Sequence, residues 1–283
     1  MNPTDDSLTA ALGQVLATPA GAWSFAAFAT LWGALWGSFF NVCIHRIPLY
    51  ESVVHPRSRC PQCGRGIHAL ENIPVLSWLL LRGRCAGCAM PISLRYPLVE
   101  LLSALLALAI WHRLQHQPDD AVHLLAHFFF DFALCGTLLV LAGIDLDHLI
   151  IPDRITYPAI PIFFVAALLL RQVSPFELVL GPFVGYGLVL VVAEVGYLVL
   201  AREAMGYGDA KLLAVVGAAL GWRAAAFAFF AAPFAGLLVT VPLLLWRKKK
   251  LLGAGEMPYG PFLAVASGVY VLYESEIRHL LSF

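Results

Sequence analysis

The stretch HLLAHFFFDFALCGTLLVLAGIDLDHLIIPDRITYP, residues 123–158, decides the class of fold. Its first part, residues 123–144, is an apolar run of the length that a membrane-spanning helix needs, about 20 residues. Asp145 and Asp147 follow at the end of this run, and Pro152 then breaks the helix. The stretch therefore predicts a transmembrane helix that ends in carboxylates near the membrane surface.

The composition of the whole chain agrees with a membrane environment. Its 283 residues are 60% hydrophobic and 13% charged, with a mean hydropathy of +0.79, whereas a soluble domain carries about 25% charged residues. We therefore expect membrane lipid around the chain. The formal net charge of +0 argues against a nucleic-acid partner. No secretory signal is expected, because the first twenty residues contain two Asp and no Lys or Arg.

Further apolar runs extend this prediction to an all-α polytopic membrane protein with about eight transmembrane helices. The eight runs are residues 22–44, 97–111, 123–144, 157–170, 177–201, 210–220, 224–246 and 258–273. The sixth run is short, because Gly221 and Trp222 follow it directly. With both chain ends outside, fourteen of the 18 Lys and Arg residues fall on the cytoplasmic side, as the positive-inside rule requires. Seven spans would place the basic residues 247–250 outside, against that rule.

This arrangement predicts three segments. Residues 1–44 hold a periplasmic N-terminus and the first transmembrane helix, residues 45–96 form a small cytoplasmic domain, and residues 97–283 form a seven-helix membrane domain.

The cytoplasmic segment carries two CxxC pairs with 21 residues between them, made of Cys60, Cys63, Cys85 and Cys88. Four thiolates in this pattern favour one tetrahedral Zn²⁺, although the usual gap is about 15 to 20 residues. Two disulfides, or a redox dithiol, are the alternatives, and a reducing cytoplasm argues against the disulfides. Because four thiolates leave no open coordination position, we expect the zinc to be structural.

A second membrane-level carboxylate is Asp209, which follows Gly206, Tyr207 and Gly208 and opens the next helix. Such groups cost about 2.5 to 3.5 kcal/mol in the bilayer and indicate function. Two carboxylates about 4 Å apart repel by about 4 kcal/mol, so that one stays protonated, as in aspartic proteases. The helix dipole favours Asp209 as the base and Asp145 as the acid. The alternative for Asp209 is simple N-capping of its helix.

Other acidic residues fit this pair less well. Asp131 lies about 21 Å from Asp145 along the same helix, and Asp147 lies about 200° round it. Glu100 and Glu194 lie within apolar runs. The alternatives for each are a structural hydrogen-bonding role and a place in the lining of a cavity.

Six stretches in order make the chain resemble the type IV prepilin leader peptidase family of bifunctional membrane enzymes. They are GSFFNVCIHRIP, HPRSRCPQCG, ENIPVLSWLLLRGRCAGC, ISLRYPLVE, IDLDHLIIPDRITYP and GYGDAKLLA. The resemblance implies a protein of the bacterial inner membrane with its active site facing the cytoplasm. It implies that the membrane domain is a peptidase and that Asp145 and Asp209 are its catalytic aspartates. It also implies that the four paired cysteines bind zinc.

The same resemblance implies the substrates and a second activity. The family cleaves a short basic leader from type IV prepilins and type II secretion pseudopilins after a Gly. It then methylates the new N-terminal residue with S-adenosylmethionine. The chain has no strand–GxG–helix pattern, so the residues that bind this donor are unknown.

Three alternative functions remain open. One is a peptidase of this lineage without methyltransferase activity. Another is a transporter or channel, with Asp145, Asp209, Asp131 and Glu194 along a proton or metal path. The third is an assembly factor that uses the zinc domain for docking.

Overall fold

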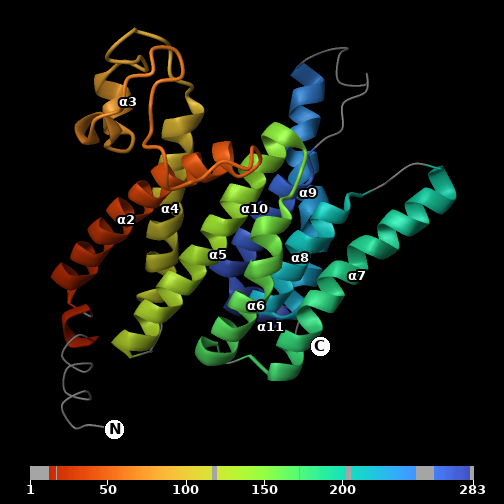
Figure 1. Cartoon of the computed structure of the whole chain (residues 1–283). Coiled ribbons are helices and arrows are strands. Elements are labelled where there is room, and N and C mark those ends of the chain that lie inside the picture. The colour runs from red at the N-terminus through yellow and green to blue at the C-terminus, as the bar shows by residue number, and fades with distance from the viewer. Residues whose placement is uncertain are drawn as a thin grey trace. The chain divides into compact units, whose positions relative to one another are not determined.

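The computed structural model describes residues 13–16, 18–116, 120–171, 173–201, 205–246 and 258–280. These residues form helices and loops, with only two isolated β-bridges. The helices are α2 (Pro19–Arg46), η1 (Ala69–Asn72), α3 (Leu76–Leu80), α4 (Arg95–Leu114), α5 (Ala121–His148), α6 (Asp153–Leu170), α7 (Pro175–Leu200), α8 (Tyr207–Leu220), α9 (Trp222–Trp246), α10 (Gly260–Leu272) and α11 (Glu274–Leu280) (Figure 1).

Each of the eight predicted apolar runs is a helix in the structure. Six of them are long and apolar enough to cross a membrane, namely α2, α4, α5, α6, α7 and α9. The other two, α8 and α10, have 14 and 13 residues, which is less than the full bilayer thickness requires. The chain is therefore an all-α, multi-pass membrane protein. The basic residues 202 and 247–250 and most of the N-terminal tail lie outside the described residues.

The chain divides into two compact units, Met1–Gly136 and Thr137–Phe283. In the first unit, α2 and α4 pack along each other. Gly33 and Gly37 of α2 allow this contact: a Cβ on Gly33 would lie 2.5 Å from the Ser103 carbonyl oxygen, and one on Gly37 would lie 2.7 Å from Glu100 Cα. This is the small-residue packing that membrane helices use.

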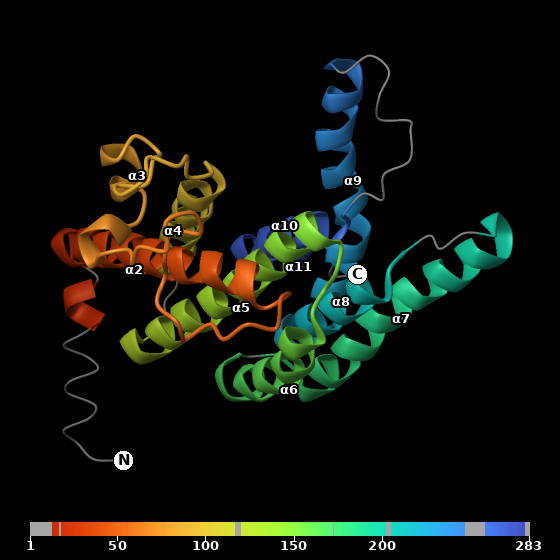
Figure 2. The ribbon, with the colours of Figure 1, turned by 45° about the horizontal axis from the view of Figure 1, so that its top comes forward.

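In the second unit, α8 is the central helix and contacts α6, α7, α9 and α10 (Figure 2). From Asp209 to Leu220 its side chains are buried, apart from the half-buried Lys211. Because protein rather than lipid surrounds α8, this helix can be shorter than a lipid-exposed span.

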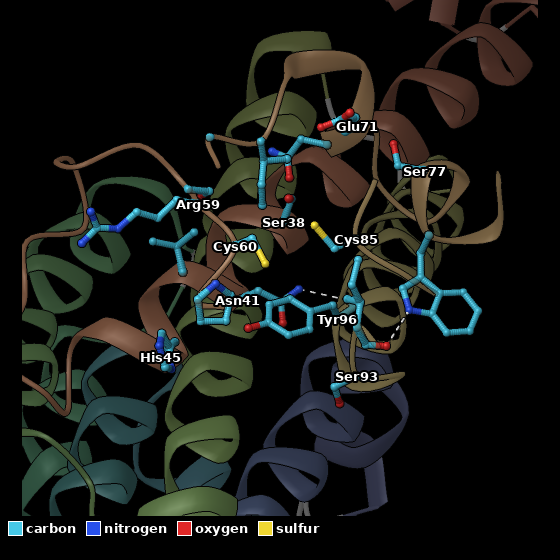
Figure 3. Close-up of a pocket in the computed structure, with 18 of the residues that line it drawn as sticks. Ser38, Asn41, His45, Arg59, Cys60, Glu71, Ser77, Cys85, Ser93 and Tyr96 are labelled. Atoms are coloured by element: carbon cyan, nitrogen blue, oxygen red, sulfur yellow. Dashed lines mark hydrogen bonds between the residues drawn. The ribbon is translucent and has the colours of Figure 1, made fainter. Parts of the chain in front are cut away.

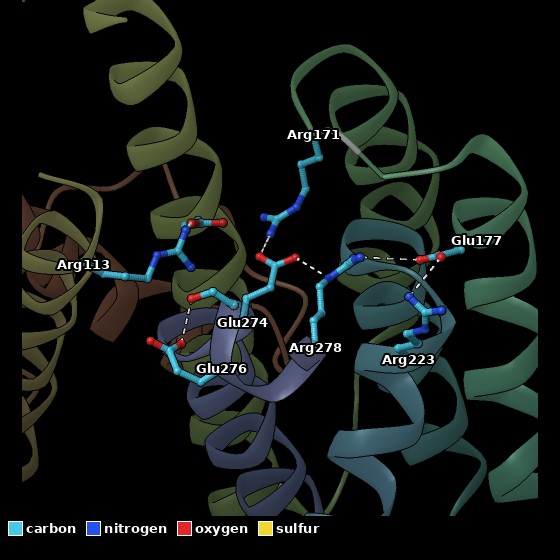
Figure 4. Close-up of polar contacts among 9 residues, drawn as sticks. Arg113, Arg171, Glu177, Arg223, Glu274, Glu276 and Arg278 are labelled. Atoms are coloured by element: carbon cyan, nitrogen blue, oxygen red, sulfur yellow. Dashed lines mark hydrogen bonds and ion pairs between the residues drawn. The ribbon is translucent and has the colours of Figure 1, made fainter. Parts of the chain in front are cut away.

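One end of the second unit is joined by a network of ion pairs (Figure 4). Glu274 of α11 pairs with Arg171, which follows α6, and with Arg278. Glu177 of α7 pairs with Arg278 at 3.7 Å and with Arg223 of α9 at 3.3 Å. The network ties α11 to the ends of three longer helices.

Candidate active site and metal centre

The structure brings Asp145 and Asp209 together in the second unit. Asp145 lies in the last turn of α5 and is 6% exposed, while Asp209 is the third residue of α8 and is 7% exposed. The charge of Asp145 acts on the Asp209 carboxyl, so the two groups are close enough to repel each other. The predicted pairing therefore has a structural basis. The N-cap alternative for Asp209 is wrong, because Gly206 is the N-cap of α8.

The backbone of a glycine at the start of a helix contacts each carboxylate. The N–H of Gly260, the first residue of α10, donates to Asp145 Oδ2 at 2.9 Å. Gly206 lies beside the Asp209 carboxylate, since a Cβ added to it would be 3.5 Å from Asp209 Oδ2. Backbone N–H groups at a helix N-terminus stabilise negative charge. Since Asp145 faces the start of α10 and Asp209 lies in the first turn of α8, the assignment of one as base and the other as acid stays a prediction.

The starts of α6 and α8 are joined beside this pair. Pro152 is the N-cap of α6, in agreement with the predicted break, and the following Asp153 forms an ion pair with Lys211. Gly208 faces Ile151, so that a Cβ at position 208 would lie 3.0 Å from the Cβ of Ile151. The glycines around Tyr207 thus have separate roles: Gly206 approaches the carboxylate and Gly208 makes room for the α6 connection.

The other acidic residues have different surroundings. Asp131 is fully buried and forms an ion pair with Arg113 at 3.0 Å. Glu100 accepts a hydrogen bond from the Val75 N–H at 2.7 Å. Asp147 and Glu194 are exposed. A path through Asp131 and Glu194, as a transporter would need, has no support in these contacts.

Two residues near the carboxylates were missed by sequence reasoning, Tyr259 and Gly260. The charge of Asp209 acts on the Tyr259 phenol, so this side chain also lies close to the pair. The only signal in the sequence is a Gly-Pro step at the start of the last apolar run, and it does not reveal the distant residue that the Gly260 amide contacts.

The four paired cysteines meet in the first unit. All four sulfur atoms lie within 4.8 Å of one another, and the Sγ atoms of Cys60 and Cys88 are 3.7 Å apart. A tetrahedral site with Zn–S distances of 2.3 Å needs S···S distances of about 3.8 Å. All four thiols are free, so the disulfide alternative is wrong. This donor set fits a tetrahedral metal ion.

Two equivalent backbone turns present these cysteines. In the first, the Cys60 N–H donates to Arg65 O and the Gly64 N–H donates to Cys60 O, each at 2.9 Å. In the second, the Cys85 N–H donates to Met90 O and the Ala89 N–H donates to Cys85 O. Hydrogen bonds from the backbone of Cys63 and Gln62 lower the pKa of Cys60 to about 6, which favours the thiolate that a metal needs. Despite a backbone hydrogen bond from Met90, desolvation and the other three thiols raise the pKa of Cys88 to about 11, so Cys60 is the thiol that ionises first of these two.

A cavity of about 1180 Å³ lies in the first unit between the cysteine segment and the helices α2 and α4 (Figure 3). Its lining combines the aromatic rings of Trp78 and Tyr96 with the carboxylates of Glu71 and Glu100. Asn41 donates to the Tyr96 carbonyl at 3.0 Å and fixes the start of α4 against α2. The cavity is the kind of mixed apolar and polar pocket that binds small organic ligands.

Together, the fold and these sites define a polytopic membrane protein with a buried pair of carboxylates and a four-cysteine centre. The Bacterial Peptidase A24 N-terminal domain profile matches residues 31–114, and the Type IV leader peptidase family profile matches residues 132–241. The chain belongs to this family of type IV leader peptidases.

Relatives from several bacteria support this assignment. The prepilin leader peptidase/N-methyltransferase of Aeromonas hydrophila is 37% identical over 90% of this chain and 93% of its own length. The protein of the same name from Dichelobacter nodosus is 35% identical over 96% and 98%, respectively. The one from Pseudomonas putida is 37% identical over 89% and 92%. No solved structure is significantly similar to the chain.

Proposed function

We propose that the chain is an aspartic endopeptidase that removes the basic leader of type IV prepilins, type II secretion pseudopilins or both, and that Asp145 and Asp209 are its catalytic residues. The observation that carries this proposal is the buried pair of carboxylates, each contacted by a glycine backbone. Both family profiles and the names of the relatives support the peptidase class.

The proposed reaction uses one ionised and one protonated carboxyl group. The ionised group takes a proton from a water molecule while the water oxygen attacks the carbonyl carbon of the leader Gly. The protonated group gives its proton to the carbonyl oxygen, which yields a tetrahedral diol. When the diol collapses, the C–N bond breaks and the leaving nitrogen takes a proton from the pair. Burial of the carboxylates strengthens each of these interactions.

Isosteric substitutions test the pair. Co-expressed with a prepilin, Asp145→Asn and Asp209→Asn are each expected to abolish leader cleavage, measured by the mass of the pilin product. Asp147→Asn is the matched control, because Asp147 lies two residues from Asp145 on the same helix but is exposed. Full cleavage by either of the first two variants would refute the proposed pair.

We also propose that the chain N-methylates the new N-terminal residue, and that the cavity beside the cysteine segment binds S-adenosylmethionine. When bound, S-adenosylmethionine supplies an electrophilic methyl group to the new amine. In this chain the rings of Trp78 and Tyr96 would pack against the adenine, and the carboxylates of Glu71 and Glu100 would lie near the cationic part of the ligand.

Donor binding can be measured on the full chain in detergent. Tyr96→Ala should weaken S-adenosylmethionine binding in calorimetry and leave leader cleavage unchanged, with Tyr50→Ala as a matched control outside the cavity. If wild-type protein yields cleaved pilin without the mass of one methyl group, the alternative of a peptidase without transferase activity is correct.

For the cysteine centre we propose a structural Zn²⁺ held by Cys60, Cys63, Cys85 and Cys88. The purified chain should contain one zinc ion, measured by elemental analysis, and Cys88→Ser should lose it. Cys135→Ser is the control, because this buried thiol lies in α5 and outside the cluster. Retention of zinc by Cys88→Ser would contradict a four-cysteine site.

We further propose the bacterial inner membrane as the location, with the carboxylate pair facing the cytoplasm. The domain boundaries 1–44, 45–96 and 97–283 belong to the same proposal. The count of basic residues on the two sides supports this orientation.

A further inference from the structure

Gly260 makes a contact that the catalytic scheme does not by itself explain. It opens α10, and its backbone N–H donates to Asp145 Oδ2 in buried surroundings, across 115 residues of sequence. A glycine is often needed for a left-handed backbone. Gly260, however, is not among the glycines with a positive φ, which are Gly64, Gly83 and Gly221. The reason for a glycine here must therefore be space.

The surroundings of Gly260 show which group needs that space. A Cβ added to Gly260 would lie 2.8 Å from Asp145 Oδ2, 3.2 Å from its Cγ and 3.4 Å from its Cβ. The added carbon would be fixed to the backbone of α10, whereas the carboxylate is the tip of a side chain. A side chain at position 260 would therefore push the Asp145 carboxylate out of its place.

We propose that Gly260 is a positioning residue for Asp145. Its amide fixes one oxygen of the carboxylate, and its missing side chain lets the carboxylate approach that amide. The inference rests on the proposed peptidase function, because it assumes that Asp145 reacts with the substrate. A displacement of about 1 Å in such a group can cost about 10²-fold in rate.

The test compares Gly260→Ala with Gly268→Ala in the full-length protein. Gly268 lies two turns further along α10, and a Cβ there would meet nothing within 4 Å. Gly260→Ala should lower kcat for leader cleavage by about 10²-fold and leave KM within about twofold, because the residue acts on the reacting group rather than on substrate affinity. Gly268→Ala should keep the wild-type kcat.

Two further measurements separate positioning from folding. Thermal unfolding in detergent and N-methylation of a pre-cleaved pilin peptide should be unchanged in Gly260→Ala. A wild-type kcat, a rise in KM alone, or a loss of methylation and thermal stability together with cleavage would each overturn the inference. The proposed function has its own test, because it fails if Asp145→Asn still cleaves the leader, whatever Gly260→Ala does.

Discussion

At the scale of single residues, the two cysteine turns differ in one position. The residue after the second cysteine is Gly64 in the first turn and Ala89 in the second, with φ values of 69° and 58°. A left-handed backbone costs an L-residue about 1 to 2 kcal/mol, and glycine avoids this cost. A glycine also gives the unfolded chain more conformational freedom, which lowers the free energy of unfolding by about 0.4 to 1 kcal/mol. The balance favours glycine at position 89.

We therefore expect Ala89→Gly to stabilise the metal site by about 0.5 kcal/mol or slightly more. The measurement is the rate of zinc release to a chelator, which should fall. Ala86→Gly is the matched control in the same turn, because Ala86 is not among the residues with positive φ, so that this change should speed release. Equal effects of the two substitutions would contradict the strain argument.

The Asp131–Arg113 ion pair leads to a second prediction at this scale. Removal of one member of a buried ion pair typically costs about 3 to 5 kcal/mol, because the other charge stays buried. Asp131→Ala should therefore lower the Tm strongly, and the remaining folded enzyme should still cleave. Glu194→Ala removes an exposed carboxylate and should change little. A catalytic defect without loss of stability would instead revive the proton-path alternative for Asp131.

The cysteine cluster could be predicted from the sequence, because its two CxxC pairs have a distinctive spacing. The choice of Asp145 and Asp209 among the membrane-level carboxylates depends mostly on the family motifs around them. Gly260 could not be predicted. It contributes a backbone N–H, which every residue except proline has, and the space of a missing side chain. Its partner Asp145 lies 115 residues away, so neither contribution can be recognised in the sequence.

At the scale of elements, backbone-to-backbone contact between α7 and α8 places the helix that carries Asp209. A Cβ on Gly217 of α8 would lie 2.1 Å from the Gly181 carbonyl oxygen of α7, and the reverse distance is 2.0 Å. Gly185, one turn further along α7, meets Leu213 in the same way at 2.4 Å. Close approach of this kind depends on small residues in membrane helices.

Gly217→Ala should force the two helices apart. Overpacking of this kind costs about 1 to 3 kcal/mol, so we expect a lower Tm and slower leader cleavage, because α8 carries Asp209. Gly187→Ala on α7 is the matched control, since a Cβ there meets nothing within 4 Å. An unchanged Tm for Gly217→Ala would mean that α7 and α8 are not packed as closely as the structure places them.

The positions of the helices followed from hydropathy, and every predicted run is a helix. Their lengths did not follow as well. Hydropathy predicts a run at residues 157–170, whereas α6 begins four residues earlier, at Asp153. The polar residues of the first turn carry no hydropathy signal, so the prediction misses them. The shortness of α8 could be read from the sequence, but its enclosure by four helices could not, since this depends on tertiary contacts.

At the scale of the whole molecule, ion pairs neutralise the few basic residues that the predicted orientation places on the outer side. In the predicted arrangement four basic residues lie on the outer side: Arg113, Arg171, Arg223 and Arg278. Each of these four pairs with a carboxylate in the structure. The paired carboxylates neutralise these charges in the folded protein, whereas insertion itself responds to the uneven distribution of Lys and Arg.

The two short helices decide the topology of the C-terminal half. At 1.5 Å per residue, α8 and α10 are each about 20 Å long, against about 30 Å of hydrocarbon. If neither crossed, α9 would run outward and residues 247–250, Arg-Lys-Lys-Lys, would lie outside. The positive-inside rule opposes this outcome, and the enclosure of α8 by protein removes the objection to its length. We therefore predict that both cross.

A periplasm-dependent phosphatase reporter inserted after Lys250 should be inactive, and the same reporter after Phe283 should be active. An active reporter after Lys250 would mean that α8 does not cross, and that the Asp209 end of this helix reaches its partner without a full span.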